Sequence, residues 1–194
     1  MRRSPLLPLL LLPLLVSCAS SYMQHAEPSG PPGPGEAKVV FCRPSRALGG
    51  AVTFPVWDGA KLLGFSESGG YFEYRCEPGE HFFIASAQSY KGMAASLTGG
   101  NTYYVWITPR VGFLSAAVGF TRVGKDDQEM FADVQASLKE NECKQKLPEK
   151  CDPYEQNRRD TIQEVLGEFR AGKRTSEEPL RAEDGRRDGA APQL

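Results

Sequence analysis

The sequence predicts a mainly β protein: a small seven-stranded β-sandwich followed by a C-terminal α-helical hairpin. Two observations predict this fold. Residues 37–123 contain short apolar runs separated by turn residues about every ten positions, which is typical of a sandwich. After Val123 the apolar residues recur at the three- and four-residue spacing of a helix. The β segment has 87 residues, enough to build one modest hydrophobic core.

The first 17 residues are predicted to be a signal peptide. Arg2 and Arg3 precede an apolar run over residues 6–16, which contains two prolines. The run has about half of the ~20 residues that a membrane-spanning helix needs. A basic start, an apolar run and a small residue in this order are typical of secretory signals.

Residues 15–18, with the sequence Leu-Val-Ser-Cys, resemble the lipobox of bacterial lipoproteins. In that family the chain is cut before the cysteine, which is then acylated, so the resemblance implies lipid attachment at Cys18. Two acyl chains are enough for stable membrane anchoring. Ala19 and Ser20 stand where lipoproteins of the inner membrane often have aspartate, which favours the outer membrane. An ordinary signal peptide with an incidental cysteine is the alternative.

Residues 18–36 are predicted to form a lipidated tether. The segment is rich in proline and glycine and has little apolar content to bury. Its Gly-x-Gly spacing does not predict a nucleotide-binding loop. No strand precedes it, and its prolines lack the amide hydrogens that a phosphate would need.

Seven strands are predicted from runs of β-branched and aromatic residues. The turns between them are predicted at Asp58-Gly59, at residues 77–80 and at residues 99–101, where glycine, proline and asparagine gather. The predicted strands are residues 38–43, 51–57, 61–65, 71–76, 81–87, 102–108 and 117–123.

Residues 124–172 are predicted to form a two-helix extension. Asp126 begins the first helix, with Glu129 completing a capping box. Asp152 caps the second helix, Pro153 occupies its first position, and Gly172 ends it. Residues 173–194 have five basic, five acidic and almost no apolar residues, which predicts a disordered tail.

Five stretches of the β segment resemble the uncharacterised bacterial family DUF2846. The resemblance implies a sandwich similar to the carboxypeptidase-regulatory and prealbumin-like domains, and members are frequently lipoproteins. It implies no activity. Cys42 departs from the pattern, because the family more often has an aromatic residue there, and the helical extension is outside it. The matching stretches are residues 40–46, 70–72, 77–81, 100–105 and 112–114.

Export makes disulfides plausible for the four cysteines other than Cys18. Cys143 and Cys151 flank the loop between the predicted helices, and we expect them to form a disulfide that staples the helical hairpin. Cys42 and Cys76 lie at the ends of two predicted strands. Two alternatives stay open for them: a disulfide, which neighbouring strands would allow, or two buried free thiols.

Few residues have a pattern that predicts catalysis or metal binding. The net charge of -1 argues against a nucleic-acid binder. His81 follows a Pro-Gly turn and is expected to be a strand-edge residue rather than a base or ligand, while His25 is expected in solvent. Arg43 and Arg46 have either a structural role or bind an anionic glycan or lipid head group. No cofactor or metal site is predicted.

The strand at residues 102–108 is apolar on both faces. One face is expected to be covered by the C-terminal helices, and the alternative is that it forms a recognition surface. The predicted function is a membrane-anchored envelope lipoprotein, a non-catalytic binding or structural module with an envelope protein as possible partner. The alternatives are a small-ligand or glycan-binding module, or an accessory subunit of an envelope enzyme. An enzyme would gather His81, Arg43 and a carboxylate in one pocket. A glycan binder would expose a row of aromatic rings.

Overall fold

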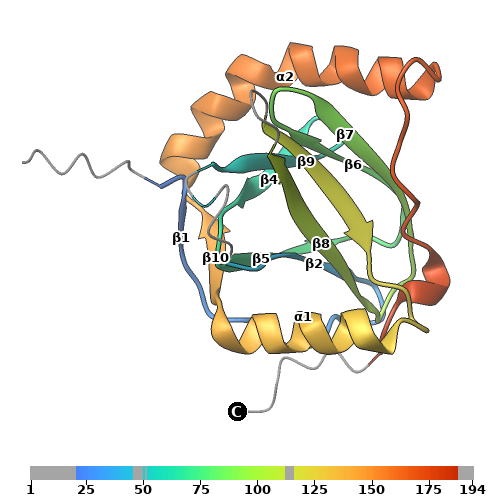
Figure 1. Cartoon of the computed structure of the whole chain (residues 1–194). Coiled ribbons are helices and arrows are strands. Elements are labelled where there is room, and N and C mark those ends of the chain that lie inside the picture. The colour runs from blue at the N-terminus through green and yellow to red at the C-terminus, as the bar shows by residue number, and fades with distance from the viewer. Residues whose placement is uncertain (1–20, 46–49, 51, 112–115, 188–194) are drawn as a thin grey trace, which may run out of the picture.

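The protein consists of two β-sheets packed face to face, with one helix on the outer face of each (Figure 1). The structure, a computed structural model, describes residues 21–45, 50, 52–111 and 116–187. The elements are β1 (Met23–His25), β2 (Ala37–Arg43), β3 (Phe54–Asp58), β4 (Lys61–Ser66), β5 (Gly70–Cys76), β6 (Gly79–Ser86), β7 (Tyr90–Leu97), β8 (Thr102–Val111), β9 (Ala116–Arg122), α1 (Gln128–Glu140), β10 (Glu142–Lys146), α2 (Pro148–Arg170) and a 3₁₀ turn, η1 (Ala182–Asp184).

Sheet A has six strands in the order β1-β10-β5-β2-β8-β9, and sheet B has four in the order β4-β3-β6-β7. The pairs β2–β8 and β10–β5 are parallel, and the other pairs are antiparallel. The prediction of a mainly β fold with two C-terminal helices is therefore confirmed. Strands β1, β7 and β10 add to the seven that were predicted.

The main core lies between the two sheets and is rich in aromatic rings. Successive side chains of a strand point to opposite faces, so Phe41 of β2 points inward while Cys42 points outward. The Phe41 ring stacks on Phe72 at 5.0 Å and meets Phe83 of sheet B edge-on at 5.1 Å. Burying each such side chain contributes roughly 1.5–3 kcal/mol, so these contacts hold the sheets together.

Helix α1 covers the outer face of sheet A. Val134 and Leu138 pack there in a second apolar cluster, and Phe131 meets the Tyr104 ring edge-on at 5.3 Å. The expected cover over the strand at residues 102–108 is thus confirmed. The helix begins one residue later than predicted, because Asp127 accepts the cap hydrogen bond, from the Met130 amide at 2.9 Å.

Helix α2 covers the outer face of sheet B, where Phe169 packs on Phe82 with ring centroids 5.3 Å apart. Gly92 makes room for this contact, since a Cβ atom there would lie 2.7 Å from the Phe82 ring. The helix begins at Pro148, not near Pro153, because Pro148 already supplies the proline favoured in a first turn. It ends as predicted, with Gly172 in the left-handed region at φ 70°.

The two helices do not form the predicted hairpin. Strand β10 lies between them in the sequence and joins sheet A beside β5. Helix α1 contacts β2 of sheet A, whereas α2 contacts β4 of sheet B. Figure 1 shows the helices on opposite sides of the two sheets. The difference arises because β10 is polar and shows no apolar alternation in the sequence.

The segment predicted as a tether is folded onto the domain from residue 21 onward. Met23 is 4% exposed and lies in the core, and its Sδ accepts a hydrogen bond from the Phe65 amide at 3.2 Å. The Leu147 amide donates to the Tyr22 carbonyl at 2.9 Å, and the Tyr22 ring stacks on Phe65 at 4.3 Å. The prediction of a tether is therefore wrong for residues 21–36. The physical reason is that Tyr22 and Met23 pack against Phe65 and fix this segment to the domain.

The predicted disorder is also wrong for residues 173–187. Residues 177–187, here named the C-terminal strap, run along the edge of sheet B and then reach sheet A. The Leu180 amide donates to the Ala94 carbonyl of β7 at 2.9 Å, and Arg186 and Thr102 exchange two backbone hydrogen bonds. Leu180 is 1% exposed, so one apolar side chain and an open strand edge together order this polar segment.

Candidate functional site

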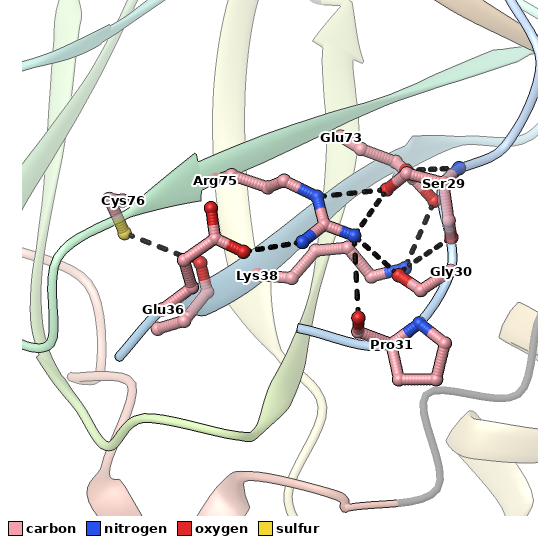
Figure 2. Close-up of polar contacts among 9 residues, drawn as sticks. Ser29, Gly30, Pro31, Glu36, Lys38, Glu73, Arg75 and Cys76 are labelled. Atoms are coloured by element: carbon pink, nitrogen blue, oxygen red, sulfur yellow. Dashed lines mark hydrogen bonds and ion pairs between the residues drawn. The ribbon is translucent and has the colours of Figure 1, made fainter. Parts of the chain in front are cut away.

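A buried polar network lies where the Pro/Gly-rich segment crosses β2 and β5 (Figure 2). Lys38 of β2 is 2% exposed. Its Nζ donates to the carbonyls of Ser29 and Gly30 at 3.0 and 3.1 Å and to Glu73 Oε1 at 3.3 Å. A lysine has three donors, and the protein itself takes all of them.

Glu73 and Arg75 of β5 complete this network, here named the N-terminal clasp. Glu73 Oε2 accepts hydrogen bonds from the Ser29 amide at 2.8 Å and from the Ser29 hydroxyl. Arg75 donates to the Gly30 carbonyl and to the Glu36 carboxylate, both at 2.6 Å. The clasp therefore holds the N-terminal segment in place and leaves no donor of Lys38 for a substrate.

The same segment is also fixed at the turn between β7 and β8. The Gly100 amide donates to the carbonyls of Gly33 and Glu36 at 3.1 and 2.8 Å. A Cβ atom at Gly99 would lie 2.0 Å from the Pro34 carbonyl oxygen, so this close approach requires glycine.

His81 lies in a second polar cluster at one end of β3. Its Nδ1 is 2.6 Å from Asp58 Oδ2, and its Nε2 is 2.9 Å from the Glu77 carbonyl. The two partners therefore engage both ring nitrogens of His81 within the protein. Asp58 also accepts from the Tyr74 hydroxyl at 2.9 Å; burial first, and then this carboxylate, raise the pKa of Tyr74. His81 has no nitrogen left to act as a base.

Arg43 has a structural role. It is 1% exposed, its Nη1 donates to the carbonyls of Val52 and Ser66 at 2.6 and 2.9 Å, and its guanidinium lies 4.6 Å above the Phe54 ring. Burial lowers its pKa. Arg46 lies outside the described residues.

The pocket that would favour an enzyme is not formed by the expected residues. Phe54, beside Arg43, and Asp58, beside His81, stand at opposite ends of β3, so the predicted charged groups do not converge. His25 is exposed on β1, as expected. Among the described residues, no group of three or more His, Cys, Asp and Glu is placed to hold a metal.

The part of the chain that the structure describes has no exposed row of aromatic rings. Its single exposed large apolar side chain is that of Val52. The half-buried Trp106 packs at the margin of the cluster under α1. These described residues therefore offer no flat aromatic platform for a glycan.

Cys42 and Cys76 do not form a disulfide, so of the two alternatives the free thiols hold. The two cysteines do lie on neighbouring strands, but Cys42 pairs with Tyr71 and Cys76 with Ala37, at opposite ends of the β2–β5 ladder. Five residues of strand separate them, roughly 17 Å, whereas a disulfide needs Cα atoms within about 7 Å. Both are free cysteines.

The predicted Cys143–Cys151 disulfide is wrong. Cys143 of β10 points into the cluster under α1, while Cys151 of α2 belongs to the main core and donates to the Tyr22 carbonyl at 3.4 Å. Because β10 separates the helices, the two thiols lie on different sides of sheet A. Both are free.

All four thiols of the folded domain are expected to be reduced and unreactive in the native state. Burial raises the pKa of each, to about 12 for Cys76 and about 11 for Cys143, so little reactive thiolate forms at neutral pH. Mass spectrometry of protein alkylated without reductant should therefore show four domain adducts in guanidinium and almost none in buffer. Fewer than four domain adducts in guanidinium would show that some of these cysteines form a disulfide and would contradict this prediction.

Alkaline pH is expected to destabilise the fold through these thiols. The pKa of a cysteine thiol in the unfolded chain is 9.0, whereas burial raises the pKa of native Cys143 to about 11. The stability that Cys143 contributes is therefore fully present below pH 9 and is lost as the pH rises through 11, on the order of 1 kcal/mol per pH unit. Urea titrations from pH 8 to 10.5 should show a shallower decline for Cys143→Ala. An equal slope in both proteins would contradict the assignment.

Comparisons with protein-family models, with curated proteins and with solved structures each give no match. The resemblance to DUF2846 thus stays a prediction. None of the helices among the described residues is long and apolar enough to cross a membrane.

Proposed function

We propose that the protein is a bacterial envelope lipoprotein, anchored through lipid at Cys18, and that it is a non-catalytic binding or structural module of the outer membrane. The observation that carries the proposal is the Leu-Val-Ser-Cys lipobox, which ends five positions before Met23, the first buried residue of the domain. A membrane and an envelope protein are its proposed partners.

The small number of residues between Cys18 and Met23 favours a domain held at the membrane surface. Five residues span at most roughly 18 Å when extended. Beyond them, the chain is fixed by the Tyr22 contacts, by the pairing of β1 with β10, and by Lys150, whose Nζ donates to the Ser21 carbonyl at 2.8 Å. A lipid at Cys18 would therefore place β1 and β10 next to the bilayer.

The polar groups of the domain support a non-catalytic role. All three hydrogen-bond donors of Lys38 are used within the N-terminal clasp, and both ring nitrogens of His81 contact acceptors of the protein. Burial also raises the pKa of the thiols. A general base or nucleophile needs a group that is accessible and correctly charged at the working pH. The candidates found by sequence do not meet this condition.

Metabolic labelling with an alkyne fatty acid tests the proposal. The wild-type chain, expressed in a Gram-negative host, should be labelled and recovered in the outer-membrane fraction. Cys18→Ser should lose the label and leave that fraction, while the matched control Cys76→Ser should keep both. Label that persists in Cys18→Ser, or is absent from all three proteins, would overturn the proposal.

A further inference from the structure

A cavity of about 740 Å³ lies between α1 and the C-terminal strap. Three separate parts of the chain form its wall: the β7–β8 turn, the region from Lys125 into α1, and strap residues 182–187. Most of its polar lining residues can donate hydrogen bonds: Asn101, Lys125, Gln135, Arg186 and Arg187. The cavity is separate from the residues that support the proposed function, since neither the N-terminal clasp nor His81 lines it.

Arg186 is held in a defined position on the cavity wall. Its guanidinium lies 3.7 Å from the centroid of the Phe131 ring, and its Nη2 donates to the carbonyls of Gly124 and Lys125, both at 3.0 Å. Its backbone is fixed by the two hydrogen bonds with Thr102. The entropy cost of ordering this long side chain has therefore been met before any ligand binds.

The donors of Arg186 are only partly used. A guanidinium has five N–H groups, and the two carbonyls engage Nη2 alone. Its Nε is buried and has no hydrogen-bond partner among the described residues. The two carbonyls do not engage the Nη1 hydrogens, so these remain for an acceptor bound in the cavity.

The charge of the lining selects the kind of acceptor. Lys125, Arg186 and Arg187 are cationic. Among the described lining residues Glu183 is the single acidic one, and its Oε1 lies 3.9 Å from Nη1 of Arg181, which does not line the cavity. A carboxylate would neutralise one of the three cations, whereas a phosphate monoester carries about -1.5 to -2 charge and three acceptor oxygens. Arginine and lysine are the usual side chains for phosphate.

We propose that this cavity binds the phosphate group of a small molecule or of a lipid headgroup, with Arg186 as the central ligand and Lys125 and Arg187 beside it. The volume exceeds that of a lone phosphate ion and leaves room for the organic part of the ligand. The cavity lies near the N-terminal end of α1, whereas β10, which pairs with β1, follows the C-terminal end of that helix. The site is therefore remote from the strand that leads to Cys18.

Calorimetric titration of the full-length protein in detergent with inorganic phosphate tests the site, at ionic strength held constant with NaCl. Arg186→Gln should weaken binding at least about tenfold, because it removes charge-assisted hydrogen bonds to the phosphate. The matched control Arg159→Gln removes the same charge from the exposed face of α2 and should change affinity less than about twofold. The double variant Lys125→Gln/Arg187→Gln keeps the test valid if Arg186→Gln does not fold.

Two further ligands distinguish the sources of phosphate. Tighter binding of glycerol 3-phosphate than of short-chain phosphatidic acid, which carries the same phosphate monoester, supports a soluble phosphate ester, and the reverse order supports a lipid headgroup. Equal losses in Arg159→Gln and Arg186→Gln, or no phosphate binding by the wild-type protein, would overturn the proposal. Loss of lipid labelling at Cys18 would not affect this result, so the two proposals can fail separately.

Discussion

Replacing Glu73 with alanine is expected to lower the free energy of unfolding by about 3–5 kcal/mol. The substitution leaves the Lys38 ammonium, 2% exposed, without its counter-charge, and leaves the Ser29 amide and hydroxyl without their acceptor. Urea denaturation measures the change. Hydrogen exchange should also show that the Ser29 amide loses its protection.

Two controls separate the buried charge from a simple loss of contacts. Glu36→Ala removes a carboxylate that also pairs with a cation of the clasp but is 47% exposed, so it should cost no more than about 1 kcal/mol. The pair Lys38→Met/Glu73→Leu replaces both buried charges with apolar groups and should recover most of the lost stability. A Glu73→Ala cost as small as that of Glu36→Ala would show that Lys38 is not buried as a charge.

Leu180→Ala is expected to destabilise the protein by about 3 kcal/mol, within the 2–5 kcal/mol typical of buried leucines. Leu180 is 1% exposed, and its backbone makes two of the hydrogen bonds that attach the C-terminal strap to β7. Thermal and chemical denaturation measure the loss. The control Val52→Ala, at a side chain that is 37% exposed, should change stability by less than about 0.5 kcal/mol.

This experiment also tests whether the strap is ordered in solution. The polar composition of residues 173–194 predicts disorder, and a disordered leucine could be truncated without cost. A Leu180→Ala variant as stable as the wild type would therefore reinstate the sequence-based prediction.

The strands predicted from the sequence are those with aromatic or β-branched alternation, such as β2 and β5. Strand β7 was missed because its centre consists of glycine, methionine and alanine. These residues are neither β-branched nor aromatic, so they give no strand signal in the sequence. Strand β10 was missed because Cys143 is its one buried residue. Both are strands because a neighbouring edge pairs with them, which local sequence does not encode.

The N-terminal clasp shows the same limit. Lys38 interrupts a buried apolar strand, and a charge there requires a partner, so the sequence contained a signal for a buried ion pair. The partner depends on the register of β2 against β5, which sets Lys38 opposite Arg75 and diagonal to Glu73. The alternatives for Cys42 and Cys76 stayed open for this reason too, because adjacency of their strands says nothing without the register.

The pairing of β1 with β10 dictates when the first part of the chain can fold. Met23 pairs with Lys146, which lies 123 positions later, and Tyr22 accepts its hydrogen bond from Leu147. This edge of sheet A therefore cannot close until residue 146 is available, whether the chain folds during synthesis or after the proposed export. Closing so long a loop is a late and entropically costly step. Residues 22–25 are thus joined to the domain only after most of the chain is available to fold.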